Sequence, residues 1–239
     1  MYMTSWQRDT YNSLFDVAEA DDRLVASGKS THLHRLLSII RDHGAHHHMG
    51  IRLLHRHNLI EEGEIMIADT LDDDEGFAVV SQAMSGADTR KDVVPSSWQL
   101  VGSDFAPSEF SLKHLVREDS LAIHESDALL RDLAAAVHEM GVQNLLGPCL
   151  NMNDWVYSHS PTKDAILLEK TNHEHRANVS RFVSEEEFRS VKSRETTWQV
   201  STASGSGIDH PGNLIAKCKC ACSVATGGGH LGTHVWLGH

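Results

Sequence analysis

Cysteine, proline and aromatic residues are all scarce in this sequence. Four Cys and five Pro occur among 239 residues, and Phe, Trp and Tyr together make up 6%. Three of the four cysteines, Cys218, Cys220 and Cys222, alternate within five residues. On a strand such side chains stand parallel on one face and cannot easily bridge one another. This pattern disfavours a disulfide scaffold and predicts free or metal-bound thiols in a reducing, cytoplasmic compartment.

Long apolar runs and an excess of basic residues are also missing. No window approaches the length of a membrane-spanning helix, so we expect no membrane partner. The first residues lack the basic start and apolar stretch of a secretory signal. Acidic residues outnumber basic ones by 33 to 21, a formal net charge of -12. A chain this acidic repels phosphate backbones, and without a basic groove a nucleic-acid partner is disfavoured.

Several catalytic signatures are absent as well. No G-x-G-x-x-G or Walker pattern opens a helix after a strand, which leaves a nucleotide-binding core without support. The sequence contains neither an H-E-x-x-H helix nor a G-x-S-x-G elbow, so it lacks the central motifs of zincin proteases and of α/β-hydrolases. Histidine, in contrast, is abundant, with eighteen residues, and its charge changes near neutral pH.

Local patterns predict both helices and strands. Apolar stripes indicate helices over Ser30 to Asp42 and after Ser126, the second ending at Gly141, and a capping box at Ser184 begins a short one. Extended patterns occur over residues 49–57, 64–68, 77–82, 98–101, 166–171, 177–183, 196–201 and 214–224. Because strands outnumber helices and the intervals between them are short, we predict an α+β fold. It would be a mostly antiparallel sheet with three or four helices, in a single compact domain over 1–239 with a Cys/His-rich segment over 214–239.

The C-terminal segment has the composition of a metal site. Cys218, Cys220 and Cys222 are followed by a glycine run and then by His230 and His234. Zinc prefers four nitrogen or sulfur ligands in a tetrahedron, and copper(I) also accepts thiolates and imidazoles. The spacing is not that of a standard zinc finger. The alternative is a buried strand that uses Cys as a small apolar residue, with His on a frayed tail.

A second candidate site lies around His55 and His57. On a strand both imidazoles point to one face, and Glu61 follows across a turn. Two histidines and a carboxylate are the ligands of mononuclear iron enzymes, and the spacing resembles the first cupin motif. It departs from that motif by a first spacer one residue short and by a missing glycine. The alternative is one core histidine bonded to a backbone carbonyl and one exposed histidine.

Other residues are candidates for catalysis and for substrate binding. Glu61 or Glu64 can act as a general base beside a metal-bound water. Arg176 and Asn178, beside a predicted strand, can orient an anionic small-molecule substrate; equally they can make surface hydrogen bonds.

Four patches resemble a family of uncharacterised fungal proteins of similar length. They are residues 50–57 with 61–64, His175-Arg-Ala-Asn178, Glu195-Thr-Thr-Trp198 and the terminal Cys/His segment. The resemblance covers about a quarter of the chain and implies a fungal, soluble, single-domain protein, without an activity that could be transferred.

Three functional hypotheses follow. The first is a metal-binding cytosolic protein, with zinc at the Cys/His cluster, that acts as a small-molecule hydrolase or tailoring enzyme. The second is a non-catalytic binding or interaction protein with a structural Cys/His tail. The third is a cupin-like mononuclear iron enzyme centred on His55, His57 and Glu61.

Overall fold

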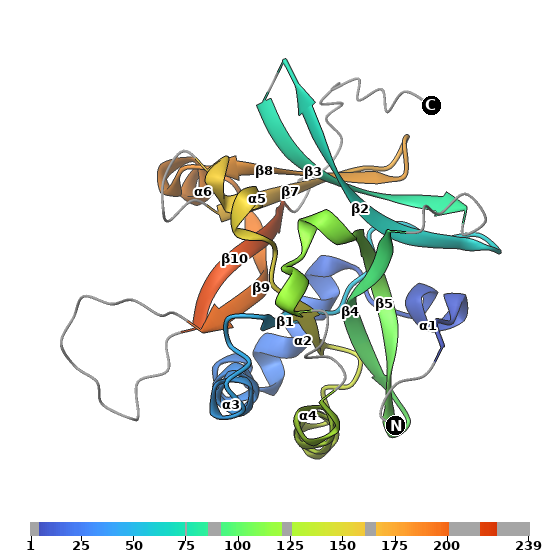
Figure 1. Cartoon of the computed structure of the whole chain (residues 1–239), viewed down its shortest axis with the longest axis vertical. Coiled ribbons are helices and arrows are strands. Elements are labelled where there is room, and N and C mark those ends of the chain that lie inside the picture. The colour runs from blue at the N-terminus through green and yellow to red at the C-terminus, as the bar shows by residue number, and fades with distance from the viewer. Residues whose placement is uncertain are drawn as a thin grey trace.

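The strands of this protein close into a barrel (Figure 1). The computed structural model describes residues 5–74, 76–85, 92–120, 126–160, 166–200 and 216–223. Within these ranges ten strands follow the order β1-β6-β4-β5-β2-β3-β8-β7-β10-β9, and β9 pairs again with β1. Neighbours are antiparallel except for β2 with β5 and β7 with β10. The strands are β1 (Met49–Leu53), β2 (Glu64–Asp73), β3 (Gly76–Ser85), β4 (Val93–Val101), β5 (Asp104–Leu112), β6 (Leu146–Leu150), β7 (Ile166–Asn172), β8 (Ala177–Val183), β9 (Ser193–Val200) and β10 (Ala216–Ser223).

The predicted fold class is therefore wrong. In place of a mostly antiparallel α+β sheet with three or four helices, the described residues form a closed barrel with six α-helices. Strands β5 and β6 account for much of the difference, because the sequence pattern did not indicate them. Strand β6 pairs with both β1 and β4 and so removes two sheet edges. The helices are α1 (Arg8–Asn12), α2 (Val17–Ser27), α3 (Lys29–Asp42), α4 (Asp127–Met140), α5 (Asp154–Ser158) and α6 (Glu185–Ser190), with a 3-10 turn η2 (Lys113–Leu115).

The locally encoded helices are confirmed. Helices α3 and α4 lie where the apolar stripes predict them, and Gly141 ends α4 in the left-handed conformation with φ of 69°. The Ser184 side chain accepts a hydrogen bond from the Glu187 N–H, as the capping box requires. No helix in the described part of the chain is both long and apolar enough to cross a membrane.

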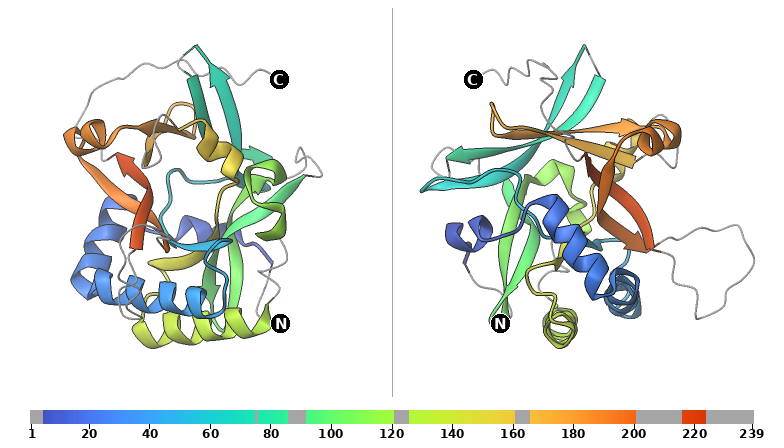
Figure 2. Two further views of the ribbon diagram at one scale, coloured as in Figure 1. Left: turned by 60° about the vertical axis from the view of Figure 1, so that its left-hand side comes forward. Right: turned by 180° about the vertical axis from the view of Figure 1, so that it is seen from behind.

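The main apolar core lies between the barrel wall and the helices. Helices α2, α3 and α4 gather at one end of the molecule (Figure 2). Leu36 of α3 and Leu133 of α4 belong to one buried cluster with Ile51 and Leu53 of β1 and with Trp98 of β4. Because side chains alternate along a strand, Arg52 of β1 faces the other way, into the barrel. There Arg52 meets Glu109, and the candidate site lies beside this buried ion pair.

The connection between β1 and β2, residues 54–63, turns away from the barrel wall. The predicted strand over residues 49–57 ends at Leu53, because the pairing with β6 stops after one more bond, from Leu54, and the backbone then bonds to the N-terminal segment. The Leu54 N–H donates to the Leu145 carbonyl and the Arg56 N–H to the Phe15 carbonyl. The Asn12 side-chain amide bonds both backbone groups of Ile60. These bonds fix the segment that carries His55 and His57.

A glycine in β6 permits the close approach of β4. A Cβ atom built on Gly147 would lie 1.9 Å from the Trp98 carbonyl oxygen, which is backbone and cannot move aside cheaply. We expect Gly147→Ala to lower the free energy of unfolding by about 2 kcal/mol or more, as overpacking does. Urea denaturation measures this change. Gly63→Asn is the control, because Gly63 has φ of 79°, which Asn tolerates, and no atom lies near its added Cβ; equal stability of the two variants would contradict the packing argument.

Candidate metal centre

Four buried side chains from three parts of the barrel converge on one point. They are His55 and His57 of the β1–β2 connection, Glu169 of β7 and Cys222 of β10, and one ligand atom from each lies within 4.8 Å of all the others. The parallel pairing of β10 with β7 places Cys222 beside Glu169 in register. Imidazole, thiolate and carboxylate are all ligands that zinc accepts. The cluster can therefore hold a metal ion.

Hydrogen bonding fixes the orientation of His55. Its Nδ1 lies 2.8 Å from the Leu53 carbonyl oxygen, so Nδ1 carries the proton and donates. The lone pair is then on Nε2, which lies 3.3 Å from the Cys222 sulfur. A ring N–H held by a carbonyl is the usual support of a metal-binding histidine.

His57 lies against a carboxylate without a well-aligned hydrogen bond. Its Nε2 is 2.8 Å from Glu169 Oε1, and the two side chains are 3% and 5% exposed. The ring nevertheless makes no hydrogen bond at Nε2 to any described group. At 2.8 Å the contact is close but poorly directed, so this nitrogen is less well satisfied than buried polar atoms usually are. A cation bound by both the ring nitrogen and the carboxylate would give each of them a well-directed partner.

Burial and neighbouring charge set the protonation of the cluster. Burial, followed by His57 and Arg52, lowers the pKa of His55 to about 3, which leaves this imidazole neutral. Burial and then Glu169 raise the pKa of the Cys222 thiol well above its usual value. Burial alone would raise the pKa of Glu169, but His57 and Arg52 lower it. A carboxylate and a neutral imidazole are thus present before any ion binds, and Cys222 must lose its proton to become a ligand.

A second ion pair lies inside the barrel beside the cluster. Arg52 of β1 contacts Glu109 of β5 at 2.8 Å, with side chains 19% and 11% exposed. Glu109 and Glu169 raise the pKa of Arg52 against the effect of burial. Strands β1 and β5 are separated by β6 and β4 in the barrel order, so this pair reaches across the interior.

The structure brings some of the predicted metal ligands together. His55, His57 and Cys222 belong to one cluster, and the Cys220 sulfur lies 4.0 Å from the other oxygen of Glu169. Cys218 of β10 pairs through its backbone with Trp198 of β9, but the Cys218 side chain is outside the described part of the chain. His230 and His234 also lie outside them, so their role as ligands stays a prediction. The cysteines whose side chains are described form no disulfide bond.

The predicted catalytic and substrate-binding residues lie elsewhere. Glu61 is 80% exposed and 3.7 Å from Arg176, and Glu64 receives two hydrogen bonds from the same guanidinium. Neither joins the four ligands. Asn178 is fully buried in β8, and its amide makes no hydrogen bond to the described part of the chain. General-base and substrate roles for these residues stay predictions.

Glu169 was not among the ligands predicted from the sequence. It stands in the apolar run Ile166-Leu-Leu-Glu169, and an acidic residue inside a predicted strand is the signal that could have revealed it. Glu61 was predicted as the carboxylate instead, because it is close to His57 in the sequence. The alternative interpretation, one core histidine bonded to a carbonyl and one exposed histidine, is right for the first histidine and wrong for the second. His55 makes that bond, but His57 is buried beside it.

Comparisons with protein-family models, with curated proteins and with solved structures found no match to this chain, so a function must be argued from the site itself.

The pairing of Glu64 with Arg176 predicts a contribution to stability that depends on pH. The Arg176 guanidinium, through its hydrogen bonds, lowers the pKa of Glu64 below its ordinary value. A group with a lowered pKa in the folded state stabilises the fold above its unfolded pKa, and the contribution is lost as the pH falls through the folded value. We therefore expect Glu64→Gln to lower the melting temperature at about pH 7 and to have little effect at about pH 3.

Glu62→Gln is the matched control, because Glu62 is an exposed residue two positions before Glu64. A pH-independent effect of Glu64→Gln, or an equal effect of the control, would contradict the linkage.

Proposed function

We propose that this protein binds a zinc ion inside its barrel through His55, His57, Glu169 and Cys222. The observation that carries the proposal is the convergence of these four buried side chains within 4.8 Å. Two supporting features are the carbonyl that orients His55 and the Nε2 of His57 that lacks a hydrogen-bond partner among the described residues. Two nitrogens, one sulfur and one oxygen satisfy the tetrahedral preference of zinc.

The ion in this proposal is structural. Catalytic zinc keeps one coordination position open for water or substrate, whereas four protein ligands fill a tetrahedron. All four ligands are buried, and they come from the β1–β2 connection, β7 and β10. An ion there ties the connection to two strands of the wall. The proposal thus takes the metal from the first sequence hypothesis and the non-catalytic role from the second, and it disfavours a hydrolase.

Metal analysis of the untagged protein tests the proposal. We expect about one equivalent of zinc by mass spectrometry after purification without added metal. His57→Ala and Cys222→Ser should each lose it, because each removes a ligand that the others cannot replace. Cys149→Ser is the control, since Cys149 is a buried thiol in β6 that does not belong to the four ligands. A protein without stoichiometric transition metal would overturn the proposal.

Removal of the ion should also destabilise the barrel. An ion present at about a thousand times its dissociation constant adds about 4 kcal/mol to the stability of the folded state. For a domain of this size we expect a chelator to lower the melting temperature by about 10 °C. The measurement is differential scanning calorimetry with and without the chelator, and restored zinc should reverse the shift. The Cys222→Ser protein should melt at the same temperature in both buffers; an equal shift there would show that the chelator acts elsewhere.

One observation favours a second function, a mononuclear iron enzyme. Two histidines and a carboxylate form the facial triad of non-haem iron sites, and here Glu169 stands where the sequence suggested Glu61. The two functions differ in their need for the thiol. If the site is an iron triad, Cys222→Ser should still bind iron(II) under anaerobic conditions while His57→Ala should not. If it is a zinc or copper(I) site, both variants should lose the metal, and elemental analysis identifies which ion the parent protein holds.

A further inference from the structure

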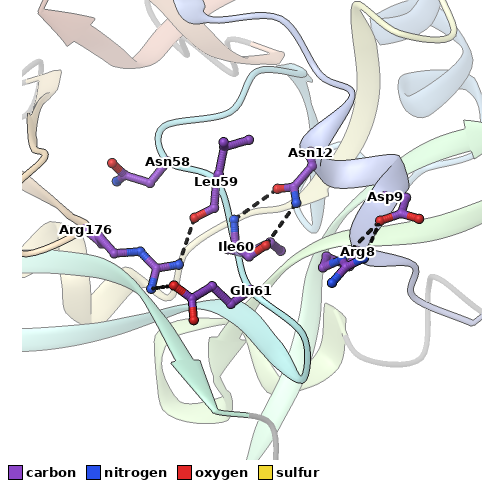
Figure 3. A pocket seen from close by; sticks show the side chains of 8 residues that line it. All are labelled: Arg8, Asp9, Asn12, Asn58, Leu59, Ile60, Glu61 and Arg176. Atoms are coloured by element: carbon purple, nitrogen blue, oxygen red, sulfur yellow. Dashed lines mark hydrogen bonds and ion pairs between the residues drawn. The ribbon is translucent and has the colours of Figure 1, made fainter.

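A pocket of about 580 Å³ lies outside the β1–β2 connection (Figure 3). Its wall is formed by residues of α1, by residues 58–61 of the connection and by Arg176 of the turn before β8. Its volume lies within the range of small-molecule sites. None of the four metal ligands lines it.

Two guanidinium groups stand on either side of this pocket. In Figure 3, Arg8 and Asp9 lie on one side of the Leu59–Ile60 stretch and Arg176 lies with Glu61 on the other. Arg8 donates through Nε and one terminal nitrogen to a single oxygen of Asp9. Leu59 between them is 62% exposed, an unusual degree for a large apolar side chain. The pocket thus offers cations at two ends and an apolar surface in the middle.

Arg176 brings unused hydrogen-bond donors to this pocket, beside the acceptors on Asp9 and Glu61. Arg176 makes three hydrogen bonds, two to Glu64 and one to the Leu59 carbonyl. Glu61 lies 3.7 Å from Nη1, beyond hydrogen-bond distance, so two of the five N–H groups make no hydrogen bond to the described residues. The Asn58 Nδ2 is buried and likewise makes no hydrogen bond to the described residues. Unsatisfied donors in a pocket call for a ligand with acceptors.

The backbone of Arg176 is held in an uncommon conformation. Its φ is 50°, the left-handed region, and it is the one non-glycine residue with positive φ in the described part of the chain. Residues in that region persist where their surroundings fix them, and they concentrate at ligand sites. The bonds to Glu64 and Leu59 fix the guanidinium in position before any ligand arrives.

From these features we infer that the pocket binds a small organic anion whose two carboxylates are separated by a short apolar chain. One carboxylate would pair with Arg176, the other with Arg8, and the chain would lie over Leu59. Asp9 and Glu61 compete for the same cations, but both are exposed, 87% and 80%, and a ligand carboxylate can replace their contacts. None of the metal ligands lines the pocket, so the inference requires no contact between the anion and the zinc site.

Titration calorimetry with adipate tests the inference. Hexanoate, which has one carboxylate, and hexane diamine, which has two ammonium groups, are the comparison ligands. We expect adipate to bind, hexanoate to bind more weakly and the diamine not to bind. Arg8→Gln and Arg176→Gln should each weaken adipate binding about tenfold, as loss of a charged hydrogen bond does. Glu61→Gln should strengthen it, because it removes a competing carboxylate.

Arg131→Gln is the matched control, since Arg131 is an exposed residue of α4 that does not line the pocket. Arg176→Gln removes the pairing with Glu64, so Arg8→Gln, whose partner Asp9 is exposed, decides the result if Arg176→Gln unfolds. Absence of adipate binding, equal binding of the diamine, or an unchanged affinity in Arg8→Gln would overturn the inference. The titration is repeated after zinc removal, so a failure of the zinc site remains distinguishable from a failure of this pocket.

Discussion

The buried carboxylate of Glu169 is the constraint that organises the interior of this barrel. A charge taken out of water is costly unless it is paired and hydrogen-bonded. Glu169 is 4% exposed and meets His57 at 2.8 Å, the Cys222 thiol at 3.4 Å and the Ser180 hydroxyl at 3.5 Å. These partners come from the β1–β2 connection, from β10 and from β8. One carboxylate thereby specifies how three other parts of the chain must sit against β7.

The protein partners alone do not complete this arrangement. Within the described residues the nearest contact, His57 Nε2 at 2.8 Å, is not aligned with the carboxylate as a hydrogen bond, and Arg52 is paired with Glu109. A thiol is a weak donor, and its raised pKa keeps it neutral. A divalent cation would satisfy the carboxylate, the thiolate and both imidazoles at once. This is the physical reason to prefer a metal centre to an ion-pair network at the same place.

How far the sequence predicts this structure depends on the range of the interactions. Helices α3, α4 and α6 follow from stripes and caps within a few residues, and those patterns suffice to locate them. Strand β6 has only five residues, and Pro148 among them is unusual in a strand, so the sequence shows no extended pattern there. Without β6 the closure of the barrel could not be predicted. The histidine pair was found from its spacing, and Cys222 was predicted as a ligand of a separate C-terminal site, but Glu169 was not predicted. Glu169 and Cys222 follow His57 by more than a hundred residues, and only the parallel pairing of β7 with β10 brings them together.

The β1–β2 connection links the two sites proposed for this protein. His55 and His57 face the buried cluster, and the residues that follow, from Asn58 to Glu61, form a wall of the outer pocket. Asn12 and Phe15 hold the same segment from the N-terminal side through the backbone of Ile60 and Arg56. A segment without a strand of its own has few ladder bonds to keep its position. An ion bound on the inner side of this segment would therefore also fix the wall of the outer pocket. The shape of that pocket would then depend on the metal ligands, although none of them lines it.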